Sequence, residues 1–160
     1  MKIIPLSYPD DIARVRRVFD AATDYVFLEY GTAPNDALIK DFFQDRPPQV
    51  PAANCHHIGI EKDGDVIGAA GFLFGFPKPT DCYIGLLILA PLERDRGIGT
   101  RVVEHITASA RSQGAMRLLI AVLDENHKGR AFWNAQGFRH LQTFPPTSDR
   151  HTRHRMGRDL

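Results

Sequence analysis

Two apolar runs joined by a glycine turn and a helical segment constrain the fold more than any other part of the chain. The runs are CYIGLLILA at residues 82–90 and RLLIAVLDEN at residues 117–126. The first is almost continuously apolar, which is typical of a strand buried on both faces of a sheet, and the second, apolar from Leu118 to Leu123, is expected to be another central strand. Residues 97–113 between them carry apolar side chains at helical spacing and stop at Gly114. Strand, turn, helix and strand form a crossover unit, which predicts a right-handed connection within one sheet.

Further strands and helices are expected on either side of this unit. They are a strand at 2–6, a helix capped by Ser7 or Asp10 that runs through Ala22, a second helix around 38–43, a hairpin at 56–76 with an Asp63–Gly64 turn, a helix at 128–138, a strand at 139–144 and a last edge strand at 150–158. The segment TDYVFLEYGTAP at residues 23–34 breaks the helical period and is expected to form an aromatic-rich loop.

Composition limits the class of protein. The 160 residues are 43% hydrophobic and 24% charged, which suits one domain over residues 1–160 with a substantial core. The formal charge of +1 gives no electrostatic reason to expect a nucleic acid partner. No apolar run is long enough to span a bilayer, and the N-terminus turns polar too early for a secretory signal. We therefore expect a cytoplasmic protein with no membrane partner.

The two cysteines and seven histidines form neither a disulfide framework nor a metal-ligand spacing. Cys55 and Cys82 lie far apart in the sequence and are expected to be reduced, buried thiols. His56 follows Cys55, but neither cysteine stands in a recognisable nucleophile arrangement. The sequence therefore predicts no metal and no acyl-enzyme.

The turn ERDRGIGTRVV at residues 93–103 is the candidate ligand site. It opens a helix, whose N-terminus presents unpaired N–H groups and the positive end of the helix dipole. Gly97 and Gly99 let an anion approach the backbone, and Arg94 and Arg96 offer charge-assisted contacts. It is neither a P-loop, because no GKS or GKT follows, nor a GxGxxG loop, because position 102 is valine. Taken alone, the turn suits an ordinary helix entry with solvated arginines better than a ligand site.

In its context the turn resembles the signature of the GNAT acyl-CoA-dependent N-acyltransferases. Four matches occur in the family's order: the strand YIGLLILAP, Arg-x-x-Gly-x-Gly at 94–99, Asn126, and Gly137-Phe138. The spacing N-x-x-[AG]-x-x-[LF]-aromatic-x-x-x-G-F is also met from Asn126 onward. The resemblance covers about residues 58–144. It implies an α/β (α+β) fold with a mixed, mostly antiparallel sheet of six to seven strands, splayed between the two central strands and flanked by about four helices.

The resemblance further implies acetyl-CoA, or another acyl-CoA, as co-substrate. The pantetheine arm would follow the backbone of Ile88, Leu89 and Ala90, with an N–H near Leu89 polarising the thioester carbonyl. Asn126 would border the far side of that arm. The pyrophosphate would lie on the residues of the turn, which are Arg94, Asp95, Arg96, Gly97, Ile98, Gly99 and Thr100.

Two positions depart from the family pattern, so the general acid and the general base of the reaction are not assigned by the resemblance. Trp133 stands where the family often has a tyrosine that protonates the departing thiolate, and an indole N–H is not a useful acid at neutral pH. Tyr83 stands where many lysine-acetylating members carry a carboxylate. The amine must lose a proton before it attacks. The candidate bases are Glu29, Asp24 and Tyr83.

The segment at 23–34 falls where the family commonly covers the acceptor site. Tyr25 and Tyr30 are therefore candidate walls of the acceptor pocket, although an aromatic loop packed on the core explains them equally well. Asp24 and Glu29 would suit a cationic small amine, and they would serve equally as solvated loop charges.

The sequence thus predicts an N-acetyltransferase that moves an acetyl group from acetyl-CoA to a primary amine of a small molecule or peptide, by direct attack in a ternary complex. An acyl-CoA-binding module without catalysis and a nucleotide or phospho-ligand binder are the alternatives. The edge strand expected at 150–158 offers a way to pair two chains as a homodimer.

Overall fold

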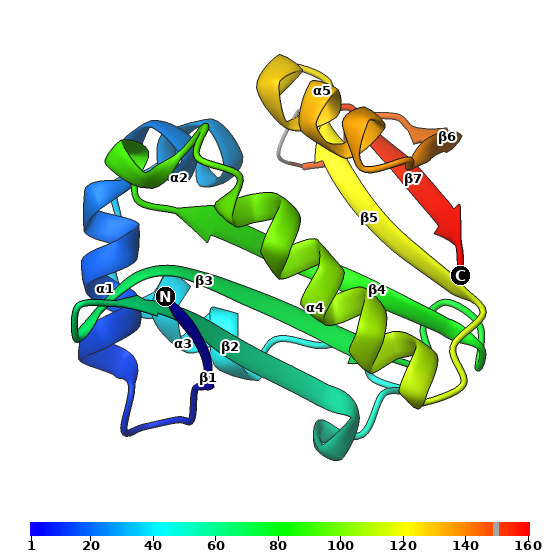
Figure 1. Ribbon diagram of the computed structural model, residues 1–160. Helices are drawn as coiled ribbons and strands as arrows, with labels where there is room; N and C mark the ends of the chain where they lie inside the picture. The colour runs from blue at the N-terminus through cyan, green and yellow to red at the C-terminus, as the bar shows by residue number, and fades with distance from the viewer. Residues whose placement is uncertain (149–150) are drawn as a thin grey trace.

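A seven-stranded mixed sheet with helices on both faces forms the protein (Figure 1). The computed structural model describes residues 1–148 and 151–160. The strands run in the order β1-β2-β3-β4-β5-β7-β6. Their bounds are β1 Lys2–Pro5, β2 Cys55–Lys62, β3 Asp65–Phe74, β4 Asp81–Leu89, β5 Arg117–Leu123, β6 Arg139–Phe144 and β7 Arg153–Asp159. β4 and β5 pair in parallel, and the other neighbouring strands pair antiparallel, which confirms the predicted mixed sheet.

The helices divide between the two faces of the sheet. The described residues contain five, which are α1 Ile12–Ala21, α2 Thr23–Tyr30, α3 Asp36–Gln44, α4 Ile98–Ser112 and α5 His127–Ala135. Short 3-10 turns occur at Ala52–Asn54 and Pro91–Glu93. One core lies under α4 and α5, and a second lies under α1, α2 and α3. No helix in the described part of the chain is long and apolar enough to cross a membrane.

A bulge at Gly85 explains why β4 reads as an unbroken apolar run. Gly71 of β3 pairs with Leu86 while the next residue pairs with Ile84, so Gly85 is an extra residue in β4. Before the bulge, Ile84 packs in the core under α4; beyond it, Leu87 packs there and Leu86 faces the opposite core. The strand therefore supplies apolar side chains to both cores without a simple alternation.

β4 and β5 run side by side only briefly. Residues 81–84 of β4 pair with residues 117–120 of β5. Beyond that point β4 continues along β3, and β5 continues along β7 (Figure 1). The sheet is therefore splayed between these two strands, as expected.

The expected loop at 23–34 is wrong, because residues 23–30 form α2. This helix ends at Gly31, whose φ of 66° is the left-handed conformation that favours glycine. Ala22 alone separates α2 from α1, so the apolar period breaks although helical structure resumes at once.

The expected cap was also wrong: α1 begins after Asp11, whose carboxylate accepts a 2.8 Å hydrogen bond from the Ser7 N–H.

β7 is an inner strand and not the expected edge strand. It lies between β5 and β6, so β6 is the edge. A Cβ at Gly157 would lie 2.9 Å from Leu119 of β5 and 2.7 Å from Leu141 of β6, so glycine allows both neighbours to pack closely. The proposed pairing of two chains through residues 150–158 loses its basis, and residue 150 lies outside the described residues.

A buried ion pair links β4 and β5 at the start of the short segment where the two strands pair. Asp81 is 3% exposed and accepts hydrogen bonds from Arg117 Nε at 3.1 Å and Nη2 at 3.0 Å. We predict that Asp81→Asn lowers the free energy of unfolding in urea by about 3 kcal/mol, because Arg117 would keep a partly buried charge without its partner. Asp65→Asn, which removes an exposed 3.6 Å pair with Arg17, is the control and should leave stability unchanged. Equal losses in the two variants would contradict this role.

Candidate active site

The N-terminus of α4 is open to a ligand. Asp95 and Gly97 have φ values of 59° and 74°, and the helix begins at Ile98. The first N–H bonded along the helix is that of Arg101, which donates to the Gly97 carbonyl at 3.2 Å. No side chain caps α4, so the N–H groups of residues 98–100 have no acceptor among the described residues. Such a terminus attracts an anion.

The two arginines of the turn have different roles. Arg94 folds back: its Nε donates to the Leu89 carbonyl at 3.1 Å, and its Nη1 and Nη2 donate to the two carboxylate oxygens of Asp24 at 2.6 and 3.0 Å. Arg94 thus fastens α2 to the end of β4. Arg96 is 60% exposed and lies 3.8 Å from the Glu93 carboxylate. Arg96 is therefore the more accessible cation of the turn.

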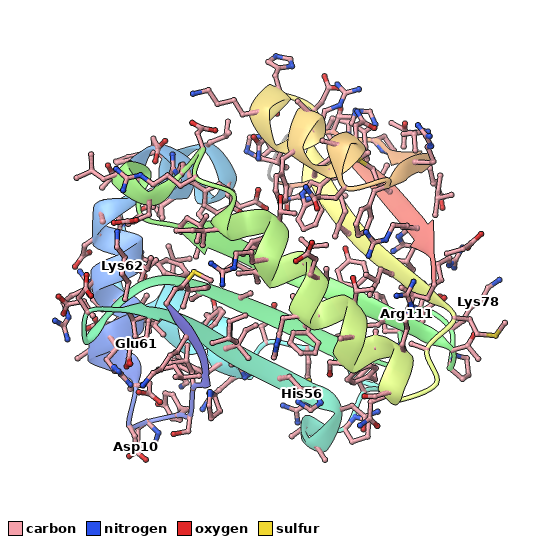
Figure 2. The ribbon with its side chains drawn as sticks, viewed as in Figure 1. Asp10, His56, Glu61, Lys62, Lys78 and Arg111 are labelled. Carbon is pink, nitrogen blue, oxygen red and sulfur yellow. The ribbon has the colours of Figure 1, made fainter. Side chains whose placement is uncertain are left out.

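The turn is also anchored to the β2–β3 hairpin. Lys62, which Figure 2 labels, lies at the end of β2. It donates to the two carboxylate oxygens of Glu93 at 3.0 and 2.9 Å. A separate cavity of about 440 Å³, lined by His56, Asp81 and Gly114 among others, lies by the C-terminal end of α4. That cavity is at the far end of α4 from the turn, so we do not place the chemistry there.

Packing explains two of the motif's residues. A Cβ at Gly99 would lie 3.0 Å from the Phe132 ring, so glycine lets α4 approach α5. Asn126 caps α5, because its Oδ1 accepts the Gly129 N–H at 2.9 Å. A Cβ at Gly129 would lie 2.6 Å from the Asn126 amide, so the two residues fit together. Gly99 and Asn126 therefore each have a structural role. Their contacts with a ligand stay predictions.

The backbone of β4 offers two N–H groups toward the splay. Ala90 donates to the Ile67 carbonyl and accepts from the Glu93 N–H, both at 2.9 Å, so its backbone groups are engaged. Alternate residues of an antiparallel strand point to the same neighbour, so Ile88 also faces β3. The N–H groups of Leu87 and Leu89 face away from β3. From the sequence, an N–H near Leu89 is expected to meet the ligand, and that of Leu87, two residues earlier, faces the same way.

The candidate acceptor residues come together from α2 and β4. Burial raises the pKa of Tyr83, Arg155 and Arg153 oppose that rise, and the charge of Glu29 adds to it. Burial raises the pKa of Tyr25 well above its usual range, and Glu29 again adds to it. Glu29 lies 3.9 Å from the Arg153 guanidinium.

The remaining candidates are less suited to proton transfer or to enclosing an acceptor. Hydrogen bonds from Arg94 lower the pKa of Asp24, which makes this carboxylate a weak base. Tyr30 is 41% exposed at the end of α2 and lies at the surface.

Neither cysteine is poised to form an acyl-enzyme. Burial raises the pKa of Cys82 to about 12, and it also raises the pKa of Cys55. A protonated thiol is a poor nucleophile at neutral pH. The described residues contain no group of three or more histidine, cysteine, aspartate or glutamate side chains placed to hold a metal ion.

A family model decides the relationship of this chain to known proteins. The model of the acetyltransferase (GNAT) family matches residues 15–138. The chain belongs to the GNAT family. The predicted family is therefore confirmed, and with it an acyl-CoA-dependent acyltransferase as the class of enzyme. A search of curated proteins finds no match.

Solved GNAT structures share the fold over the whole chain. The acetyltransferase from Thermus thermophilus has a TM-score of 0.83 and 24% identity, with 99% of this chain and 96% of that chain covered. The ribosomal-protein-alanine N-acetyltransferase from Brucella melitensis has a TM-score of 0.76 and 16% identity, with both chains fully covered at 100%. The ribosomal-protein-S18-alanine N-acetyltransferase from Escherichia coli has a TM-score of 0.72 and 14% identity, with 99% and 92% covered.

In this GNAT protein, the residue at the usual tyrosine position belongs to the core. Trp133 is 9% exposed, and its ring centroid lies 4.9 Å from that of Phe132 and 5.0 Å from that of Phe138. The structure therefore gives Trp133 a packing role and leaves Tyr83, a partly buried phenol beside Arg155, as a candidate proton donor.

The ionisation of Tyr83 distinguishes a proton donor from a base. We predict that ultraviolet difference titration of the parent protein against Tyr83→Phe shows this phenol ionising above pH 10, because burial disfavours the phenolate. A phenol with such a pKa is protonated at neutral pH and can donate a proton. Ionisation below pH 10 would show that Arg153 and Arg155 dominate, and it would restore Tyr83 as a candidate base.

Proposed function

We propose that this GNAT protein transfers an acetyl group from acetyl-CoA to a primary amine by direct attack in a ternary complex. The observation that carries the proposal is that an anion site, at the N-terminus of α4, adjoins a strand edge with outward N–H groups, at the end of β4. The open N-terminus of α4 follows directly on the strand whose Leu87 and Leu89 N–H groups face the splay. An anion site followed by a free strand edge suits a pyrophosphate followed by the extended amide chain of pantetheine.

Each part of acetyl-CoA has its own residues in this proposal. The N–H groups of residues 98–100 bind the pyrophosphate, with Arg96 beside them. The backbone of Leu87 and Leu89 pairs with pantetheine, and an N–H of this pair polarises the thioester carbonyl. Arg94 positions the turn without contacting phosphate, because its guanidinium is held by Leu89 and Asp24.

Protons move through Glu29 and Tyr83. The amine nitrogen attacks the thioester carbon, the carbon–sulfur bond breaks, and the thiolate leaves. Glu29 accepts the proton of the amine, directly or through water, and Tyr83 donates a proton to the thiolate. The protonated state of both cysteines supports direct attack and not an acyl-enzyme.

Two glycines with nearly identical conformations test the pyrophosphate site. Gly97 and Gly114 have φ values of 74° and 76°, and a Cβ at either one would meet nothing within 4 Å. We predict that each glycine-to-alanine change lowers the free energy of unfolding by about 1 kcal/mol, because both force alanine into the left-handed region. Only Gly97→Ala should also weaken CoA binding in isothermal titration, by about tenfold, because its methyl group displaces a phosphate. Equal CoA affinity in the two variants would place the anion elsewhere.

Glu29 is tested by kinetics. We predict that Glu29→Gln lowers kcat by about 100-fold in a CoA-release assay, while the KM for acetyl-CoA is unchanged, because the amide cannot accept a proton. Glu104→Gln is the matched control, because Glu104 is an exposed residue of α4 on the other face of the sheet. An unchanged kcat would remove Glu29 from the mechanism.

The same assay separates the alternative functions. CoA binding without release of CoA in the presence of any amine would favour a non-catalytic binding module. Stronger competition for the site by ATP than by CoA would favour a phospho-ligand binder.

A further inference from the structure

Two arginines of β7 point to the face of the sheet that carries α2. On this strand Met156 lies in the core under α4 and α5, and Arg158 donates to Thr107 of α4. Side chains alternate between the faces of a strand, so Arg153 and Arg155 project to the opposite face. Their proximity to Glu29 and Tyr83 agrees with this placement.

Arg155 is held between aromatic rings with a donor unused. Its guanidinium carbon lies 4.9 Å from the centroid of the Phe144 ring and 6.0 Å from that of the Tyr83 ring. Its Nε is buried and has no hydrogen-bond partner among the described residues. A buried donor without a partner is costly, which is a reason to look for a ligand that satisfies it.

Small residues leave space beside Arg155. Ala121 of β5 is its direct register partner and is exposed. Gly85 of β4, at the bulge where the splay begins, is also exposed. Arg155 therefore borders an open part of the sheet near the predicted position of the thioester.

The carboxylates on this side are already matched by arginines. Asp24 forms its two hydrogen bonds with Arg94, and Glu29 lies 3.9 Å from Arg153. In the part of the chain that the structure describes, no carboxylate lies within ion-pair distance of Arg155. The local charge thus favours an anionic group on the acceptor, which reverses the preference for a cationic amine that Asp24 and Glu29 suggested in the sequence.

We propose that Arg155 binds a carboxylate of the acceptor, so that the amine acetylated is that of an amino acid. The guanidinium fork matches a carboxylate in geometry and charge, and the flanking rings hold it in place. This inference rests on the proposed function and makes Arg155 a specificity-determining residue, distinct from Glu29 and Tyr83, which handle protons.

The first experiment uses the parent protein. The kcat/KM of CoA release is measured for a panel of amino acids, each matched with its carboxamide. We expect the best free amino acid to exceed its carboxamide by at least about tenfold, the value of one charge-assisted contact. Equal or better turnover of the carboxamides would overturn the proposal and leave the acetyltransferase function standing.

The second experiment removes the guanidinium. Arg155→Gln should raise the KM for the preferred amino acid about 10- to 100-fold, with the KM for acetyl-CoA unchanged. The kcat/KM of the carboxamide should fall less than that of the acid, because its turnover depends on Arg155 only through the neighbouring Tyr83. Arg155→Lys should recover part of the loss, because it keeps the charge without the fork. Arg139→Gln is the control for loss of one positive charge, since Arg139 is exposed on β6. Equal losses for the acid and the carboxamide would overturn the role of Arg155.

A third measurement does not depend on turnover or on the folding of a variant. N-acetyl amino acids and their carboxamides are titrated calorimetrically into the CoA-saturated parent protein. Tighter binding of the acids, by about tenfold, supports the carboxylate site even if no amine is acetylated. Equal binding of the two sets would overturn it.

Discussion

The short parallel pairing of β4 and β5 is the constraint on which the rest of the structure depends. The pairing covers residues 81–84 and 117–120, and the buried Asp81–Arg117 ion pair holds its first position. At the next residue, Gly85, the bulge shifts the register of β4 against β3, and from there β4 and β5 follow different neighbours. Backbone N–H groups in the middle of a sheet normally have partners. Here those of Leu87 and Leu89 face the splay, so a ligand can complete the sheet.

The parts of the fold that depend on sequence neighbours were predictable, and the parts that depend on distant contacts were not. The strands at 82–90 and 117–126 and the helix between them follow from apolar runs and a glycine turn, and the structure reproduces them within a few residues. α2 was missed because one residue separates it from α1 and interrupts the period. The inner position of β7 depends on the fit of Gly157 between two neighbouring strands, which no local pattern reveals.

The candidate site shows the same division. The turn was recognisable from its spacing, but the role of Arg94 depends on Asp24, which lies 70 residues away in the sequence. Gly99 and Asn126 matched the motif, and the structure shows that close contact between α4 and α5 and the cap of α5 also require them. Some residues of the motif are therefore required by the packing of the helices and not only by ligand binding.

The two halves of the site differ in whether the family model covers them. The matched region, residues 15–138, includes the turn, the free edge of β4 and the cap of α5, which are the parts proposed to hold acetyl-CoA. β7 lies beyond it, yet it places Arg153 and Arg155 against α2 and Tyr83. A terminal strand inserted beside β5 can change its outward side chains without disturbing the backbone pairing that builds the splay. β7 can therefore determine whether the site prefers an anionic or a cationic acceptor, independently of the residues proposed to bind acetyl-CoA.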